Sequence, residues 1–146
     1  MQFRYKGYHR EREVDLKRPV IEVALRNPTD ESAPVIAYEA LVDSGSDRNI
    51  FPSDLAALIG IDLIATDNVR LIGGVVAGEQ RRVYFHQVVM DLGGPGGPRF
   101  STSIGFMTDF TSIGYGLLGR RGFFDRFTFV KFKDFNSLLE IGKLRI

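Results

Sequence analysis

The residues with the clearest chemical potential are Asp43, Ser44 and Gly45, which directly follow an apolar strand pattern. A turn of this composition usually lies at the surface between polar flanks. Here two apolar residues precede it, at positions 41–42, and two more follow at 50–51. These flanks predict that most of the loop is buried. A buried carboxylate is costly unless it is paired or used, so Asp43 is the strongest candidate for a catalytic group.

The composition narrows the chemistry in which this carboxylate could take part. The chain has no cysteine and only two histidines, His9 and His86. The lack of cysteine excludes disulfides, thiolate zinc sites and cysteine nucleophiles. Two histidines cannot build a multi-histidine metal cage, and a serine triad would have to recruit one of them. We interpret both histidines as structural or surface residues and expect carboxylate chemistry without a metal or cofactor.

Size and charge indicate a single globular domain over residues 1–146, with 44% hydrophobic and 25% charged residues. The formal net charge of +1 provides no overall field that would attract nucleic acid or an anionic membrane. No apolar run approaches the roughly 20 residues that span a bilayer, and residues 1–7 lack the apolar core of a secretion signal. The expected location is therefore the cytoplasm.

Short β-branched and aromatic segments alternate with turn signals, which is typical of a mainly β chain. Strong helical periodicity is scarce. The glycine- and proline-rich stretch at 93–98 precedes a strand pattern and lacks the Lys-Ser/Thr pair of a P-loop, so it is interpreted as a plain loop. Strands are predicted at 20–25, 34–42, 83–92, 100–107, 128–133 and 138–141, and short helices at 52–59 and 121–127.

Three separated motifs together resemble the retropepsin-like aspartic proteases, single-lobed relatives of pepsin found in retroviruses and as free-standing bacterial proteins. The first is the pattern hydrophobic-hydrophobic-Asp-Ser-Gly-x-Asp at 41–47. The second is a glycine-rich segment at 71–78, which is similar to the mobile flap hairpin of that family. The third is Leu-Leu-Gly-Arg at 117–120, similar to the segment that runs beside the catalytic loop and leads into a short helix.

The resemblance covers roughly residues 20–141 and leaves residues 1–19 outside as an N-terminal extension. It implies an all-β, acid-protease-like closed barrel with one or two short helices and a flap hairpin. The helix predicted at 52–59 suits the bacterial members better than the retroviral ones. The C-terminal segment 128–146 reads as a hairpin.

Hydrolysis by this route uses two carboxylates that face each other across a water molecule, one protonated and one ionised. Two like charges about 3 Å apart cannot both ionise. One carboxylate accepts the proton of the water, and the other donates toward the carbonyl oxygen. The sequence offers one such motif, because neither the Asp-Leu-Gly at 91–93 nor the Thr-Asp-Phe at 108–110 repeats it. A second Asp43 would therefore come from a second chain, in a homodimer with a two-fold axis through the site.

The resemblance also implies roles for the neighbouring residues. Ser44 would hydrogen-bond across the dimer to the partner loop, and Gly45 would turn the chain and present its carbonyl group to substrate. Asp47 would pair with Arg120 and brace the catalytic loop. In the flap, two glycines would let the backbone approach an extended peptide while apolar side chains close over it. The flap residues expected to bind substrate are Ile72, Gly73, Gly74, Val75 and Val76.

We therefore predict an aspartic endopeptidase that is active as a homodimer on a peptide or protein substrate. The competing hypothesis is a non-catalytic module that uses the same fold to dimerise or to bind a peptide, since a fold does not determine a function. The joint presence of Asp43, Ser44 and Gly45 favours the enzyme. A serine or metal hydrolase is a third possibility, which the shortage of histidine and of metal-ligand spacing disfavours.

Overall fold

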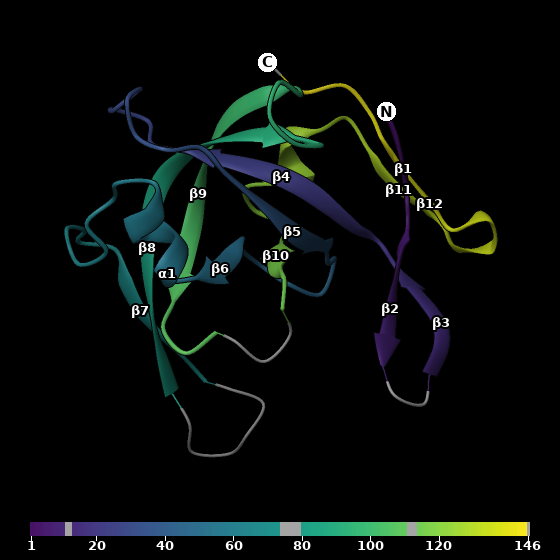
Figure 1. The fold of residues 1–146 in the computed structure, drawn as a ribbon, viewed down its shortest axis with the longest axis horizontal. Coiled ribbons are helices and arrows are strands. Elements are labelled where there is room, and N and C mark those ends of the chain that lie inside the picture. Colours follow the sequence, from purple (N-terminus) through teal and green to yellow (C-terminus); the bar gives the residue numbers. More distant parts are fainter. Residues whose placement is uncertain (11–12, 74–79, 111–113, 146) are drawn as a thin grey trace.

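The computed structural model describes residues 1–10, 13–73, 80–110 and 114–145 (Figure 1). Short strands dominate the chain, as the sequence predicts. They are β1 (Gln2–Arg4), β2 (Lys6–Arg10), β3 (Glu13–Arg18), β4 (Val20–Arg26), β5 (Ile36–Val42), β6 (Ile50–Pro52), β7 (Val69–Gly73), β8 (Gln80–Leu92), β9 (Arg99–Met107), β10 (Gly116–Leu118), β11 (Val130–Lys133) and β12 (Leu138–Ile141). The helical elements are α1 (Asp54–Leu58) and the 3-10 turns η1 (Phe124–Arg126) and η2 (Asp134–Asn136).

Six strands close into a barrel, which confirms the predicted closed all-β architecture. Their order is β4-β5-β10-β6-β9-β8, and β8 pairs back onto β4. Strand β7 continues the sheet beyond the barrel as the outer antiparallel partner of β8. Strand β10 runs parallel to β5. Because parallel strands end on the same side, the loop after β5 and the segment after β10 leave the barrel together.

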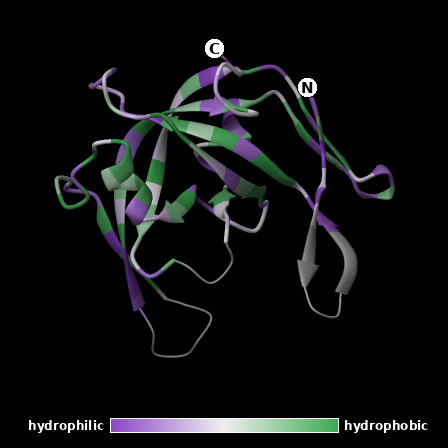
Figure 2. Cartoon of the chain, in the orientation of Figure 1, coloured by the Kyte–Doolittle hydropathy of each residue, from purple (hydrophilic) through white to green (hydrophobic). Residues whose placement is uncertain are grey.

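The core fills the inside of this barrel. Five of the seven residues of β4 are buried, as expected for a nearly continuous apolar run. Three phenylalanines from distant parts of the chain, Phe51, Phe106 and Phe123, are fully buried in one cluster. Figure 2 shows hydrophobic residues interspersed with hydrophilic ones along the barrel strands. The loop after β5 therefore extends from a strand that is packed into the hydrophobic core.

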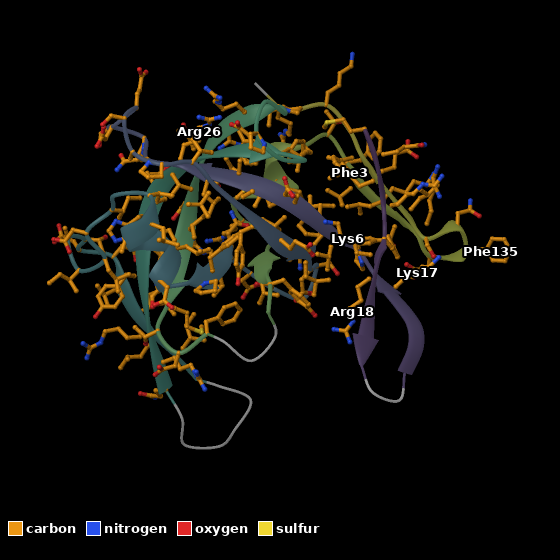
Figure 3. All side chains as sticks on the ribbon, viewed as in Figure 1. Phe3, Lys6, Lys17, Arg18, Arg26 and Phe135 are labelled. Carbon is orange, nitrogen blue, oxygen red and sulfur yellow. The ribbon has the colours of Figure 1, made fainter. Side chains whose placement is uncertain are left out.

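The N-terminal stretch divides into two parts. Strand β1 pairs antiparallel with β12, which also pairs with β11, and Phe3 packs against the main core. Strands β2 and β3 pair only with each other and project from the body as a separate hairpin (Figure 1). Near the end of the β11–β12 hairpin, Phe135 points away from the molecule and is fully exposed (Figure 3).

The predicted helices are shorter in the structure. Helix α1 begins at Asp54, because Pro52 is still a strand residue and pairs with Met107 of β9. The helix predicted at 121–127 is the single turn η1. The loop predicted at 93–98 is a loop, and three of its glycines have positive φ. Within the described part of the chain, no helix is long and apolar enough to cross a membrane.

Candidate functional site

Asp43 is the first residue after β5. Its backbone N–H donates to the carbonyl oxygen of Leu118 on the neighbouring strand, at 3.0 Å. One carboxylate oxygen, Oδ1, accepts the backbone N–H of Gly45 at 2.8 Å. No arginine or lysine pairs with this carboxylate among the described residues. The side chain thus has a defined position without a neutralising partner.

The Asp43 loop, residues 43–49, is less buried than the flanking sequence predicts. In the single chain Asp43 is half-buried, whereas Ser44, Gly45 and Asp47 are exposed. The prediction of a mostly buried loop is therefore wrong for one copy of the chain. The reason is topological, since β5 ends at the rim of the barrel and the loop bends over that rim before β6 re-enters the core.

Backbone contacts from the segment after β10 hold the Asp43 loop. The Arg120 N–H donates to the Ser46 carbonyl oxygen at 2.8 Å, and the Arg121 N–H donates to that of Asp47 at 2.9 Å. The two segments approach each other so closely that a Cβ on Gly119 would lie 2.3 Å from the Arg48 carbonyl oxygen. Only glycine fits at this crossing, which explains the glycine of the Leu-Leu-Gly-Arg motif.

Asn49 is a buried polar residue in this crossing that the sequence analysis did not identify. It is fully buried, and its Oδ1 accepts the Gly119 N–H at 2.9 Å. Its amide nitrogen donates to the Ser103 carbonyl oxygen on β9, at 3.2 Å. The side chain therefore ties the end of the Asp43 loop to two other segments. In the sequence, the one indication of this role is that an asparagine directly precedes the apolar pair at 50–51.

Asp47 and Arg120, which were predicted to pair, line the same pocket. Their side chains form no ion pair, and this holds among the described residues of the single chain. Both are exposed. In one copy the two segments are joined by the backbone hydrogen bonds given above and by Asn49.

The predicted flap begins in β7 and returns in β8. These strands form an antiparallel hairpin in which Ile72 lies opposite Arg81 and Gly73 opposite Gln80. Ile72 is half-buried and packs against a small apolar cluster centred on Phe85. The other predicted substrate contacts, Gly74, Val75 and Val76, lie outside the described residues.

A pocket of about 880 Å³ lies between the base of this hairpin and the Asp43 loop. Its lining comes from three places: the loop, strand β7 with the neighbouring β8, and the segment after β10. The lining residues are Asp47, Arg48, Arg70, Leu71, Ile72, Phe85, Arg120, Arg121 and Asp125. Of the predicted site residues, Asp47, Ile72 and Arg120 line the pocket, whereas Asp43, Ser44 and Gly45 are not among its lining residues.

His86, the second of the two histidines, has structural partners. The His86 Nε2 lies 2.7 Å from the Leu63 carbonyl oxygen, and its ring packs against Phe106, so this histidine is satisfied within the fold. Among the described residues there is no cluster of three or more histidine or acidic side chains that could hold a metal ion.

Comparison with solved structures finds a likeness to a crystal structure of a retropepsin-like aspartic protease from Rickettsia conorii. The TM-score is 0.52 at 15% sequence identity, and the match covers 84% of this chain and 80% of that chain. At this identity the likeness establishes the fold, and it confirms the predicted acid-protease-like barrel. No protein-family model and no curated protein matches the sequence.

Proposed function

We propose that this chain is an aspartic endopeptidase that forms its active site as a homodimer, with one Asp43 from each subunit. The observation that carries the proposal is the state of Asp43. The residue is half-buried, and its loop is held by hydrogen bonds to the segment after β10. Its carboxylate accepts one backbone hydrogen bond from its own loop. A carboxylate without a cationic partner is available to share a proton with a second carboxylate.

The loop geometry suits an isologous contact. Ser44 and Gly45 are exposed beside Asp43 in one copy, which leaves this face open to the same loop of a second chain. In the dimer, Ser44 hydrogen-bonds to the partner loop and Gly45 presents its carbonyl group to substrate. Asp47 and Arg120, which share the adjacent pocket, support the loop when substrate and partner are present.

The β7–β8 hairpin supplies the cover of the cleft. Ile72 contributes an apolar surface next to Phe85, and Gly73 ends β7 at the start of the segment predicted to close over the peptide. Gly74, Val75 and Val76 complete this flap in the proposal. An extended peptide then lies between the hairpin and the Asp43 loops, where the two carboxylates activate a water molecule.

The proposal is tested by mixing subunits. Asp43→Asn removes the carboxylate and should abolish cleavage of a peptide library, with fold and dimerisation retained. Wild-type chains mixed with a threefold excess of Asp43→Asn chains should lose most of their activity, because most wild-type subunits then sit in heterodimers with one carboxylate. Activity per chain should also collapse on dilution below the dimer dissociation constant.

The matched control is Asp62→Asn, an acidic residue in the turn after α1 that takes no part in the proposed site. Excess Asp62→Asn chains should leave the activity of the mixture undiminished. Full activity of a monomer, demonstrated by ultracentrifugation at assay concentration, would exclude the dimeric site. Equal cleavage by wild type and Asp43→Asn would exclude Asp43 as a catalytic residue.

Activity should have a bell-shaped pH profile with its optimum on the acidic side of neutral. The reason is that the shared-proton state of two coupled carboxylates exists only within a limited pH range. The profile is measured with one cleaved peptide at constant ionic strength. A rate that stays flat up to pH 9, or inhibition by a chelator, would indicate different chemistry.

A non-catalytic peptide-binding module is the second candidate. The large pocket beside β7 favours it, since a peptide could bind there without any reaction. The two candidates differ in one measurement. A binding module holds the same peptide with the same affinity in wild type and in Asp43→Asn, and releases it intact.

A further inference from the structure

The pocket between β7 and the Asp43 loop has a local excess of positive charge. Four arginines and two aspartates line it, which gives a formal charge of +2 in one pocket against +1 for the whole chain. The arginines come from separate segments, so folding brings this charge together. They are Arg48, Arg70, Arg120 and Arg121.

These four side chains have no carboxylate partner among the described residues. Some of the other cations among the described residues do have one. Arg26 and Arg99 both bind Asp91. Lys6 and Lys133 pair with glutamates of neighbouring strands at 3.3 and 2.6 Å. The positive charge of this pocket is therefore not compensated by an ion pair among the described residues.

Two of the four arginines share one aromatic ring. The guanidinium carbons of Arg48 and Arg70 lie 5.8 and 5.7 Å from the centre of the Phe85 ring. Phe85 is 5% exposed and belongs to the small apolar cluster with Ile50 and Val83. An arginine that lies over a ring keeps its N–H edges available for hydrogen bonds. The ring therefore contacts two cationic groups that line the same pocket.

The position of this pair fits a substrate subsite. Arg48 follows Asp47 in the Asp43 loop, and Arg70 is the second residue of β7. Leu71 and Ile72, next along β7, add an apolar surface to the same pocket. The pocket therefore offers a peptide side chain an apolar wall from β7 beside two guanidinium groups.

We infer that Arg48 and Arg70 form an acid-selective subsite, which binds a glutamate or aspartate side chain of the peptide substrate. The inference rests on the proposed function and names its substrate class. Guanidinium groups bind carboxylates through parallel N–H bonds, which gives both energy and directional selectivity. Asp47 and Asp125 of the same pocket repel further acidic groups, so the subsite takes one acidic residue at a defined place.

The experiment begins with a proteome-derived peptide library, in which cleavage sites are identified by mass spectrometry. Acidic residues should be enriched at one fixed position relative to the cleaved bond. A cleaved peptide is then synthesised in two forms, with Glu or Gln at that position. Wild type should cleave the Glu form about fivefold to tenfold more efficiently in kcat/KM, and the difference should shrink at high salt.

Variants of the pair assign the preference to these residues. Arg70→Gln should remove most of the Glu-over-Gln preference, and Arg70→Lys should retain part of it, because the charge remains without the planar fork. Arg70→Glu should favour a Lys form of the peptide. The matched control is Arg82→Gln, an exposed arginine on β8 of the same hairpin that does not line the pocket, and it should keep the wild-type preference.

Binding separates this inference from the proposed function. Calorimetric titration of Asp43→Asn with the two peptides should give the same preference for the Glu form. If wild type cleaves peptides but treats the Glu and Gln forms alike, the acid-selective subsite is wrong and the protease stands. Another outcome is that no peptide is cleaved, acidic peptides bind, and Arg70→Gln weakens their binding. In that case the proposed reaction is wrong and the subsite stands.

A general anion site would also overturn the inference. In that case 10 mM inorganic phosphate would abolish the Glu-over-Gln preference, whereas equal ionic strength supplied as sodium chloride would not. For a subsite that recognises the carboxylate within a bound peptide, the two salts should weaken the preference to the same extent.

Discussion

Two aspartates of this chain, Asp43 and Asp91, occur in similar local sequences and have opposite surroundings. Each stands at the end of a barrel strand, two residues before a glycine. Asp91 is fully buried, whereas Asp43 is half-buried at the rim of the barrel. The comparison separates a carboxylate that holds the fold together from one that remains available for chemistry.

Asp91 has a full set of partners. Two nitrogens of Arg26 donate to its Oδ2 at 2.9 and 3.1 Å, the Arg99 Nε donates to Oδ1 at 2.8 Å, and the Gly96 N–H donates to Oδ2 at 3.1 Å. Burial alone would raise the pKa of Asp91. The hydrogen bonds from Arg99, Arg26 and Gly96 outweigh it and lower the pKa to about 2. This carboxylate joins β4, β8, β9 and the loop at 93–98.

The difference teaches that burial and ion pairing alone would have selected Asp91 and not Asp43, the proposed catalytic residue. Asp91 is the more buried and the more strongly bound of the two, and its charge is already neutralised by two arginines. A catalytic carboxylate needs the opposite arrangement, with a fixed backbone and an unneutralised side chain. Asp43 has that arrangement.

The largest expected difference concerns activity. Asp43→Asn should lower kcat/KM by about 10³-fold or more, because it removes the carboxylate proposed to transfer the proton. Asp91→Asn should retain near-wild-type activity per folded molecule. The measurement is peptide cleavage at 20 °C, normalised to the folded fraction from circular dichroism. Equal losses in the two variants would contradict the separation of roles.

The order reverses for stability. Asp91→Asn should lower the free energy of unfolding by about 2–3 kcal/mol, because it leaves two arginines and a backbone N–H around a neutral amide. This loss of stability is smaller than the loss expected when a fully buried ion pair is broken, since both arginines reach solvent. Asp43→Asn should change it by less than about 0.5 kcal/mol. Urea unfolding at pH 7 measures both, and a larger loss in Asp43→Asn would reverse the comparison.

The stability contributed by Asp91 should depend on pH. Its pKa is about 2 in the folded chain and about 3.9 for an ordinary unfolded aspartate. A lowered folded pKa gives stability that is fully present above about pH 5 and is lost as the pH falls through 4 toward 2. The difference between wild type and Asp91→Asn in urea midpoint should shrink over that range. A difference that stays constant down to pH 2.5 would contradict this origin.

The smallest expected difference is the one between the two arginines around Asp91. Both arginines make two hydrogen bonds to Asp91, and Arg26→Gln should cost about 1 kcal/mol because the Arg26 side chain is only 27% exposed. Arg99→Gln should cost less, since the Arg99 side chain is 55% exposed. Thermal unfolding of the two single variants and the double variant checks the order. An Arg99→Gln effect larger than that of Arg26→Gln would show that solvent exposure is not the deciding factor.

Local sequence patterns predicted the mainly β class and the place of the candidate aspartate, but they did not predict β1, β2, β3 or β6. Apolar runs and turn residues predicted β4, β5, β8, β9 and β12 within a few residues. The end of the run at Val42 also located the Asp43 loop, because a change from apolar to polar residues is itself a local signal. Helix α1 was placed correctly but predicted too long, since Pro52 is compatible with both a strand end and a helix start.

The tertiary structure alone decided which distant residues meet. Asn49 and Gly119 are 70 positions apart, and they are hydrogen-bonded because β10 inserts between β5 and β6. Arg48 and Arg70 lie over Phe85 for a similar reason, since β7 pairs with β8 and the Asp43 loop lines the same pocket. Sequence periodicity reports which face of a strand is apolar. It does not report the order in which strands pair, and that order sets the exposure of Asp43, the burial of Asp91 and the charge of the pocket.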